Sequence, residues 1–147
     1  MKVLILYDTV IGQTEKAAQA ISSGMKEVGF TDVVLKRIKE ASEDDFRSAD
    51  VWIIGSPTHF NGTTGAVKKG AKIAAKAAVQ GKKLVAFDTR YAGVDRGATD
   101  KIAELFSDAG AQAICEPGHF IVTKALVDGE EAKATTFGRK IAGALRP

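Results

Sequence analysis

Short runs of apolar residues alternate along the chain with longer stretches in which apolar residues recur every three or four positions. The short runs are typical of strands that are covered on both faces of a parallel sheet. They predict strands at 3–7, 33–38, 51–55 and 84–88, and a fifth across 112–122 that Glu116-Pro117-Gly118 interrupts.

The intervening stretches predict amphipathic helices. Their apolar stripes consist of Ala17, Ala18, Ile21, Met25 and Val28; of Val67, Ala71, Ala74 and Ala78; of Ala98, Ile102, Leu105 and Phe106; and of Phe137, Ile141 and Leu145. Gly29, Gly81 and Gly110 follow the first three stripes, and a glycine commonly ends a helix. The segment Ser42-Glu-Asp-Asp45 is typical of a capping box and predicts a further short helix.

Strands that alternate with helices in this way predict an α/β fold. Five such units with right-handed crossovers give three layers around a doubly wound, five-stranded parallel sheet in the order 2-1-3-4-5. A chain of 147 residues is expected to form a single domain over 1–147. Ligands of such sheets bind at the carboxyl ends of the strands, which points to the loops 8–13, 56–63 and 89–97.

The loop 8–13 has the features of an anion-binding site. It joins a strand directly to a helix, and the first-turn amides of a helix have no partner within it and favour negative charge. Gly12 permits backbone conformations that are closed to other residues, and Thr9 and Thr14 add hydroxyl groups. The motifs of nucleoside triphosphate-binding and dinucleotide-binding loops are absent. The alternative is an ordinary strand-to-helix turn with a threonine cap.

Thr9, Gly12 and Thr14 resemble the Thr/Ser-x-Thr-Gly-x-Thr phosphate loop of flavodoxins, with Ile11 where that family usually has a hydroxyl. The segment Gly55-Ser-Pro-Thr58 resembles a loop of flavodoxin-like FMN domains, including those attached to diiron oxygen and nitric oxide reductases. Asn61-Gly62 adds a turn signal there. The loop 87–97 stands where the family has its third FMN loop. The resemblance covers the whole chain and suits the short-chain type.

The resemblance implies FMN as the cofactor and three groups of contact residues. They are Thr9, Val10, Ile11, Gly12, Gln13 and Thr14 for the phosphate; Ser56, Pro57, Thr58, His59, Phe60, Asn61 and Gly62 on one side of the flavin; and Asp88, Thr89, Arg90, Tyr91 and Gly93 on the other. Tyr91 is the candidate for stacking on the flavin. His59 or Phe60 would cover the ring, unless Phe60 packs back against the scaffold. Arg90 is unusual, because the family tends to place acidic and apolar groups around the ring.

Composition and charge indicate where the protein is located and which classes of partner it can bind. With 45% hydrophobic and 27% charged residues, no membrane-length apolar run and no signal peptide, we expect a cytoplasmic protein. One cysteine and two histidines do not suggest a metal centre. No acidic residue occurs between Val51 and Phe87, where Lys68, Lys69, Lys72 and Lys76 form one basic helix stripe. The stripe is either a solvated face or a docking site for an acidic redox partner. Nucleic acid is disfavoured, because no aromatic residues interleave with the lysines.

The resemblance implies an electron carrier that shuttles electrons between redox partners and needs no catalytic acid or base. One alternative is an NAD(P)H-dependent quinone or flavin reductase of the same fold, because the segment 55–60 also resembles a loop of tetrameric quinone reductases. Those chains are usually longer. A second alternative is a binding module that has kept the fold and lost the ability to bind FMN. Ile11 and the net positive charge of the chain favour this alternative. The sequence favours the carrier and leaves enzymatic activity open.

Overall fold

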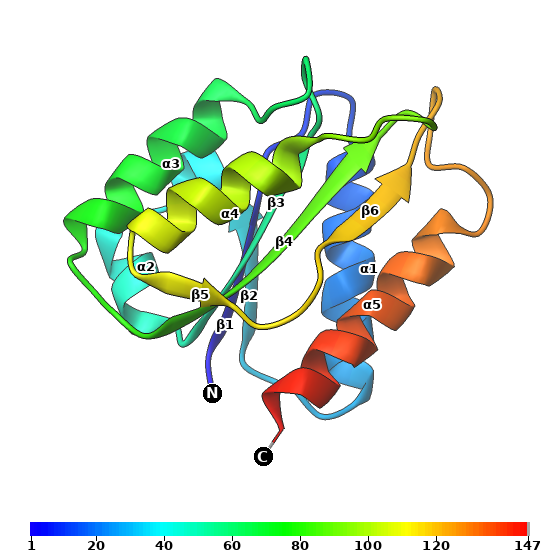
Figure 1. Ribbon diagram of the computed structural model, residues 1–147. Helices are drawn as coiled ribbons and strands as arrows, with labels where there is room; N and C mark the ends of the chain where they lie inside the picture. Colours follow the sequence, from blue (N-terminus) through cyan, green and yellow to red (C-terminus); the bar gives the residue numbers. More distant parts are fainter. Residues whose placement is uncertain (147) are drawn as a thin grey trace.

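The apolar runs form a parallel sheet that lies between two layers of helices (Figure 1), in a computed structural model that describes residues 1–146. The strands are β1 (Val3–Tyr7), β2 (Val33–Arg37), β3 (Val51–Pro57), β4 (Lys82–Arg90), β5 (Ala111–Ala113) and β6 (Gly118–Ile121). Their order is β2-β1-β3-β4-β5, and β6 also pairs with β4. The predicted fold class and strand order are confirmed.

The fifth position of the sheet is filled by two short strands in place of one. β5 pairs with the beginning of β4, at Lys82–Leu84, and β6 pairs with its end, at Phe87–Arg90. The predicted interruption at 116–118 therefore falls close to the observed break, although Gly118 itself begins β6. Pro117 lies in this break, where its missing N–H group costs no ladder hydrogen bond.

Helices cover both faces of the sheet, as the doubly wound topology requires (Figure 1). One layer holds α2 (Glu43–Ser48), α3 (Gly65–Lys76) and α4 (Ala98–Asp108), with the short 3₁₀ helix η1 (Ile38–Glu40); the other holds α1 (Gln13–Glu27) and α5 (Glu130–Leu145). Alternate residues of the strands supply the two apolar cores. Leu4, Trp52 and Phe106 belong to the first core, and Ile5 and Phe87 to the second.

The predicted capping box opens α2. The Asp45 amide donates to the Ser42 hydroxyl at 3.2 Å, and the Ser42 amide donates to the Asp45 carboxylate at 2.9 Å. Partial burial opposes ionisation of Asp45, but the hydrogen bonds from Ser42 and the nearby Lys36 ammonium together outweigh it, so its pKa is lowered. The box thus holds a stabilised carboxylate at a helix N-terminus, where the helix dipole also favours it.

Several predicted boundaries shift by a few residues. Val28 and Ala78 lie just outside their helices, because α1 ends at Glu27 and α3 ends at Lys76; Ala78 is exposed and has a left-handed φ of 54°. β3 and β4 each continue two residues further than predicted, since Ser56 and Pro57 pair with Asp88 and Thr89. Consequently residues 89 and 90, expected in a loop, lie at the end of a central strand.

Candidate functional site

A cleft opens at the carboxyl ends of the strands and is bordered by all three predicted loops. It lies at the edge of the molecule opposite the two chain termini, which are at the bottom of Figure 1. Its lining consists of Thr9, Val10, Ile11, Gln13, Thr14, Pro57, Thr58, His59, Thr89, Arg90, Tyr91, Val122 and Thr123. The remaining predicted site residues, Gly12, Ser56, Phe60, Asn61, Gly62, Asp88 and Gly93, lie beneath or around the cleft without lining it.

The loop 8–13 ends in a left-handed glycine. Gly12 is the N-cap of α1 with a φ of 89°, and its amide donates to the Thr9 hydroxyl at 3.0 Å. A Cβ added at Gly12 would meet no atom within 4 Å, so the backbone angle rather than space requires glycine. The loop turns there into α1, whose first-turn amides have no acceptor within the helix. Val10 and Ile11 are mostly exposed beside it.

The start of α1 is fixed to distant parts of the chain by side-chain hydrogen bonds. The buried Thr14 hydroxyl lies 2.8 Å from the hydroxyl of Thr89 on β4. The Gln13 side-chain oxygen accepts a hydrogen bond of 2.8 Å from the amide of Leu126. The anion-binding end of the helix therefore has a defined position relative to the sheet.

Two side chains beside the loop 8–13 were not among the predicted residues. Arg37, at the end of β2, donates from Nη2 to the Thr9 carbonyl oxygen at 3.3 Å and lies 3.8 Å from the Asp8 carboxylate. Tyr7, at the end of β1, donates to Glu15 at 2.6 Å. Burial, with Glu15 next, raises the pKa of Tyr7 to about 12, so the phenol stays protonated and remains a donor. Both residues end neighbouring strands, which is the signal that could have identified them.

The loop 56–63 is a tight hairpin whose tip is Phe60. The amides and carbonyls of His59 and Gly62 form two reciprocal hydrogen bonds of 2.8 Å. Phe60 and Asn61 between them both have positive φ values, 48° and 65°, as in a type I′ turn. The turn is therefore centred one residue before the predicted pair Asn61-Gly62.

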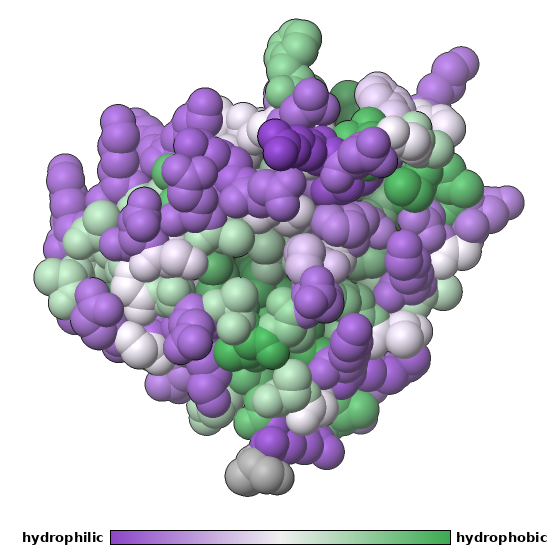
Figure 2. Space-filling view, viewed as in Figure 1, coloured by the Kyte–Doolittle hydropathy of each residue, from purple (hydrophilic) through white to green (hydrophobic). Residues whose placement is uncertain are grey.

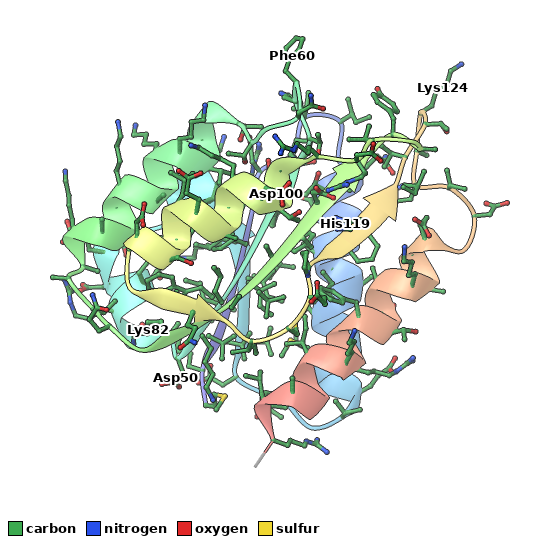
Figure 3. All side chains as sticks on the ribbon, viewed as in Figure 1. Asp50, Phe60, Lys82, Asp100, His119 and Lys124 are labelled. Atoms are coloured by element: carbon green, nitrogen blue, oxygen red, sulfur yellow. The ribbon has the colours of Figure 1, made fainter. Side chains whose placement is uncertain are left out.

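Phe60 does not pack against the scaffold. Its side chain is fully exposed. A hydrophobic side chain stands out at the top of the molecule in Figure 2, at the place where Figure 3 labels Phe60. Below the tip, Ser56 is buried, and its hydroxyl accepts a hydrogen bond of 2.8 Å from the Thr63 hydroxyl. Ser56 therefore stabilises the loop.

On the third side of the cleft, Arg90 forms a buried ion pair. Its Nε and Nη2 atoms lie 3.0 Å and 2.6 Å from the two carboxylate oxygens of Asp88, and both residues are almost completely buried. The positive charge of Arg90 is therefore compensated where it borders the cleft. Thr89 points to the opposite face of the sheet, toward Thr14, and Tyr91 is 65% exposed. Gly93 follows in the exposed part of the loop with a left-handed φ of 82°.

Val122 and Thr123 form a fourth wall that the sequence analysis missed. They belong to a small hairpin after β6, closed by the bridge between Val122 and Leu126. Lys124 stands at its tip, away from the body of the molecule (Figure 3). The last strand of the sheet also ends at the ligand-binding edge, and that topological rule would have identified this segment.

Within residues 1–146, the structure has neither a cluster of metal-ligating side chains nor a membrane-spanning helix. No cluster of three or more histidine, cysteine or carboxylate residues there is suited to hold a metal ion. Over the same residues, no helix combines the length and the apolar character needed to cross a membrane.

The fold and the cleft together define a doubly wound α/β protein with a helix N-terminus beside a cleft at its topological switch point. The flavodoxin family model matches residues 5–137, so the chain belongs to the flavodoxin family. A flavodoxin of Clostridium saccharobutylicum is 23% identical to it, over 99% of this chain and 98% of the relative. A flavodoxin of Aquifex aeolicus is 41% identical over 59 residues, which are 40% of this chain and 32% of that protein.

Other comparisons bear on the fold and on the alternative function. A solved flavodoxin from the domain Archaea superposes with a TM-score of 0.84 at 22% identity, over 97% of each chain. An NAD(P)H dehydrogenase (quinone) of Geotalea daltonii is 30% identical over 93 residues, and this match covers 47% of the present chain and 45% of the relative.

Flavodoxin family proteins bind FMN, and the groups around the cleft fit such a cofactor. The left-handed Gly12 places a helix N-terminus at one end, as a phosphate group requires. Tyr91 lines the cleft with an exposed aromatic side chain, and the exposed Phe60 stands on the loop 56–63 that borders it. A helix N-terminus, which can bind an anion, and an exposed aromatic side chain both suit a flavin mononucleotide.

Proposed function

We propose that this chain is an FMN-binding electron carrier whose phosphate site is the loop 9–14. The observation that carries the proposal is the left-handed Gly12 N-cap, which turns the loop into α1 at the end of a cleft bordered by both ring loops. Bound FMN would supply the electron-transfer chemistry, and the protein would supply binding, orientation and electrostatics. No acid or base is required of the chain.

The phosphate would be held mainly by neutral donors. The amides of Gln13 and Thr14 lie in the first turn of α1, and the helix dipole favours an anion there. Thr9 shapes the loop through its hydrogen bond with the Gly12 amide. Ile11 contributes only its backbone, so the missing hydroxyl removes one donor and leaves the amide donors in place.

The ring would lie between the loop of Ser56, Pro57, Thr58, His59, Phe60, Asn61 and Gly62 and the segment that contains Thr89, Arg90, Tyr91 and Gly93. Tyr91 would stack on one face, and His59 or Phe60 would cover the other. Both aromatic side chains are free to do so, because Phe60 is fully exposed and Tyr91 is 65% exposed. A positive φ at Phe60 is uncommon for an aromatic residue, which supports a functional reason for the shape of this turn.

The redox partners would be acidic proteins that approach over α3. Lys68, Lys69, Lys72 and Lys76 are all exposed, and none of them pairs with a carboxylate within residues 1–146. Hydrophilic side chains gather over α3 on the left of Figure 2. Since α3 begins directly after the loop 56–63, its basic face is continuous with one rim of the cleft. Such a surface would speed the encounter with an acidic partner and lose its effect as salt rises.

Titration of the apoprotein with FMN and with riboflavin tests the cofactor and the phosphate site together. We expect FMN fluorescence to be quenched on binding and riboflavin to bind at least about tenfold more weakly, because it lacks the charge-assisted hydrogen bonds of the phosphate. Equal binding of both would contradict the role given to the loop 9–14. Absence of binding to either would favour the module that has lost FMN.

Kinetic measurements separate the carrier from a reductase and test the lysine stripe. Steady-state oxidation of NAD(P)H with a quinone would favour the reductase, which the partial match to a quinone dehydrogenase and the resemblance of segment 55–60 support. With an acidic ferredoxin as the probe, Lys68→Gln/Lys72→Gln should slow electron exchange at low salt more than Lys26→Gln, which alters an exposed lysine on α1. Equal rates at all salt concentrations would contradict docking over α3.

A further inference from the structure

The Asp88 carboxylate is completely buried beneath the cleft. A buried anion is costly unless its charge is balanced and its lone pairs are hydrogen-bonded. Arg90 balances the charge through its bonds from Nε to Oδ1 and from Nη2 to Oδ2. This pair uses only part of the hydrogen-bonding capacity of the carboxylate, which has about four lone-pair sites.

Three other segments of the chain provide donors to the same carboxylate. The Thr58 hydroxyl lies 3.1 Å from Oδ2 and the amide of Thr99, at the start of α4, lies 3.4 Å from it. His119 on β6 places Nδ1 3.1 Å from Oδ1. Because an ionised carboxylate can only accept, His119 contributes its Nδ1–H. Asp88 thus connects four segments that are far apart in the sequence.

These connections extend into both loops beside the proposed flavin ring. Thr58 belongs to the loop 56–63, and its hydroxyl also accepts from the Ala98 amide at 3.1 Å. Arg90 donates from Nη1 to the Val94 carbonyl at 3.1 Å, in the middle of the loop 91–97. One carboxylate and its nearest partners therefore join the side chains of the two loops, in addition to the backbone hydrogen bond of 2.9 Å from the Thr58 amide to the Thr89 carbonyl.

The backbone at Gly97 packs tightly against Asp88 and its partners. A Cβ added at Gly97 would lie 2.4 Å from Arg90 Nη2, 2.5 Å from Asp88 Oδ2 and 2.7 Å from Thr58 Oγ1. Only glycine allows the backbone before α4 to approach the three groups so closely. The start of α4 is consequently held against the same group of atoms as the two loops.

We propose that Asp88 is a positioning residue that sets the distance between the loops 56–63 and 91–97 without touching the cofactor. Asp88 contacts the first loop through its hydrogen bond with Thr58, and it contacts the second loop through Arg90. His119 on β6 donates a further hydrogen bond to the carboxylate. The sequence analysis placed Asp88 among the cofactor contacts; it does not line the cleft. The inference rests on the proposed FMN site, because the two loops matter as the walls of that site.

The variants Thr58→Val and Thr58→Ser test this role as a matched pair. Valine has the shape of threonine but no hydroxyl, whereas serine keeps the hydroxyl and loses a methyl group. We expect Thr58→Val to raise the Kd for FMN roughly tenfold and Thr58→Ser to keep it within about twofold of the wild type. Equal affinities of the two variants for FMN would overturn the proposal.

Amide chemical shifts of the apoprotein show whether Thr58 acts through Asp88 or on the flavin directly. We expect the Thr99 amide, which donates to Asp88, to shift in Thr58→Val and to keep its position in Thr58→Ser. The Ala98 amide donates to the Thr58 hydroxyl itself, so its shift in Thr58→Val confirms only the loss of that bond. Thr63→Val is the control, because the Thr63 hydroxyl bonds to Ser56 within the loop, so those amides should stay unchanged. Weaker FMN binding by Thr58→Val without a shift of the Thr99 amide would mean direct contact and would also overturn the proposal.

The same measurements distinguish this inference from the proposed function. If the wild type binds no FMN, the proposed function fails whatever the variants do, while the amide shifts still report whether Asp88 holds the loops. If the wild type binds FMN and the valine and serine variants behave alike in both measurements, the proposed function stands and the positioning role fails.

Discussion

The phosphate side and the ring side of the cleft are held in place by different kinds of interaction. On the phosphate side, the contacts that shape the loop are neutral, namely a left-handed glycine, a helix N-terminus and a pair of buried threonine hydroxyls, and the partly exposed Arg37 and Asp8 lie beside them. On the ring side, a buried ion pair between Asp88 and Arg90 joins the two loops and the start of α4. The ring side thus depends on a buried ion pair, whereas the phosphate side depends mainly on neutral hydrogen-bonding groups.

This difference predicts that the two sides respond unequally to mutation. A neutral hydrogen bond contributes about 0.5–1.5 kcal/mol to stability, whereas removing one partner of a buried ion pair costs about 3–5 kcal/mol. Damage to the ring side should therefore lower the stability of the whole fold. Damage to the phosphate side should act more strongly on FMN than on the fold.

The largest effect is expected for Asp88→Asn. The amide leaves the buried Arg90 without a counter-charge, and the free energy of unfolding should fall by about 3–5 kcal/mol, as measured by chemical denaturation of the apoprotein. The control is Asp95→Asn in the loop that follows β4, where the carboxylate is exposed and the change should stay within about 0.5 kcal/mol. Similar stabilities for both variants would remove the distinction between the two sides.

Thr14→Ala tests the strongest contact on the phosphate side. It leaves the buried Thr89 hydroxyl without its partner, so unfolding should become easier by about 1–3 kcal/mol, and FMN should bind more weakly. Thr14→Ser keeps a hydroxyl and should restore most of both losses. Ile11→Ala changes a largely exposed side chain and should affect FMN affinity less than Thr14→Ala. A larger loss from Ile11→Ala would show that the phosphate loop binds FMN in a different way.

The two sides also differ in how far they could be predicted from the sequence. The phosphate loop is local: Thr9, Gly12 and Thr14 lie within six consecutive positions, between a strand and a helix that their periodicity identifies. The fold class and the strand order followed from the alternation of such units and are confirmed. The rule for ligands at strand ends selected loops that border one cleft.

The contacts of the ring side could not be predicted because they depend on long-range register. The strand was predicted to end at Asp88, and Arg90 to lie in a loop. Pairing with Pro57 and Ile121 extends β4 through Arg90, and the pleat turns Thr89 to the opposite face. Their partners Thr58, Thr99 and His119 are 11 to 31 residues away in the chain, so no local motif contains them. The hairpin tip was misplaced by one residue because Phe60, a poor candidate for positive φ, occupies the turn.

Gly12 allows a test of conformation alone on the phosphate side. Space around an added Cβ is open, so a substitution acts through the φ of 89°. Gly12→Val should cost about 1–2 kcal/mol in stability, since a left-handed conformation is unfavourable for most residues, whereas Gly12→Asn should cost less. FMN affinity should follow the same order in the titration. If asparagine and valine weaken FMN binding equally, the site needs the absence of a side chain, and steric access to the phosphate replaces backbone angle as the reason for glycine.

The smallest effect is expected for the exposed aromatic side chain of Tyr91. Tyr91→Ala should weaken FMN binding by about 0.5–1.5 kcal/mol, the usual contribution of aromatic stacking beyond area burial, and should change the flavin absorption envelope. Phe60→Ala is the matched test, because Phe60 is also exposed but stands at the tip of the hairpin, outside the lining of the cleft. If only Phe60→Ala alters the spectrum, Phe60 and not Tyr91 stacks on the flavin. If neither does, the ring side holds the flavin through its backbone, and the geometry set by Asp88 becomes its main determinant.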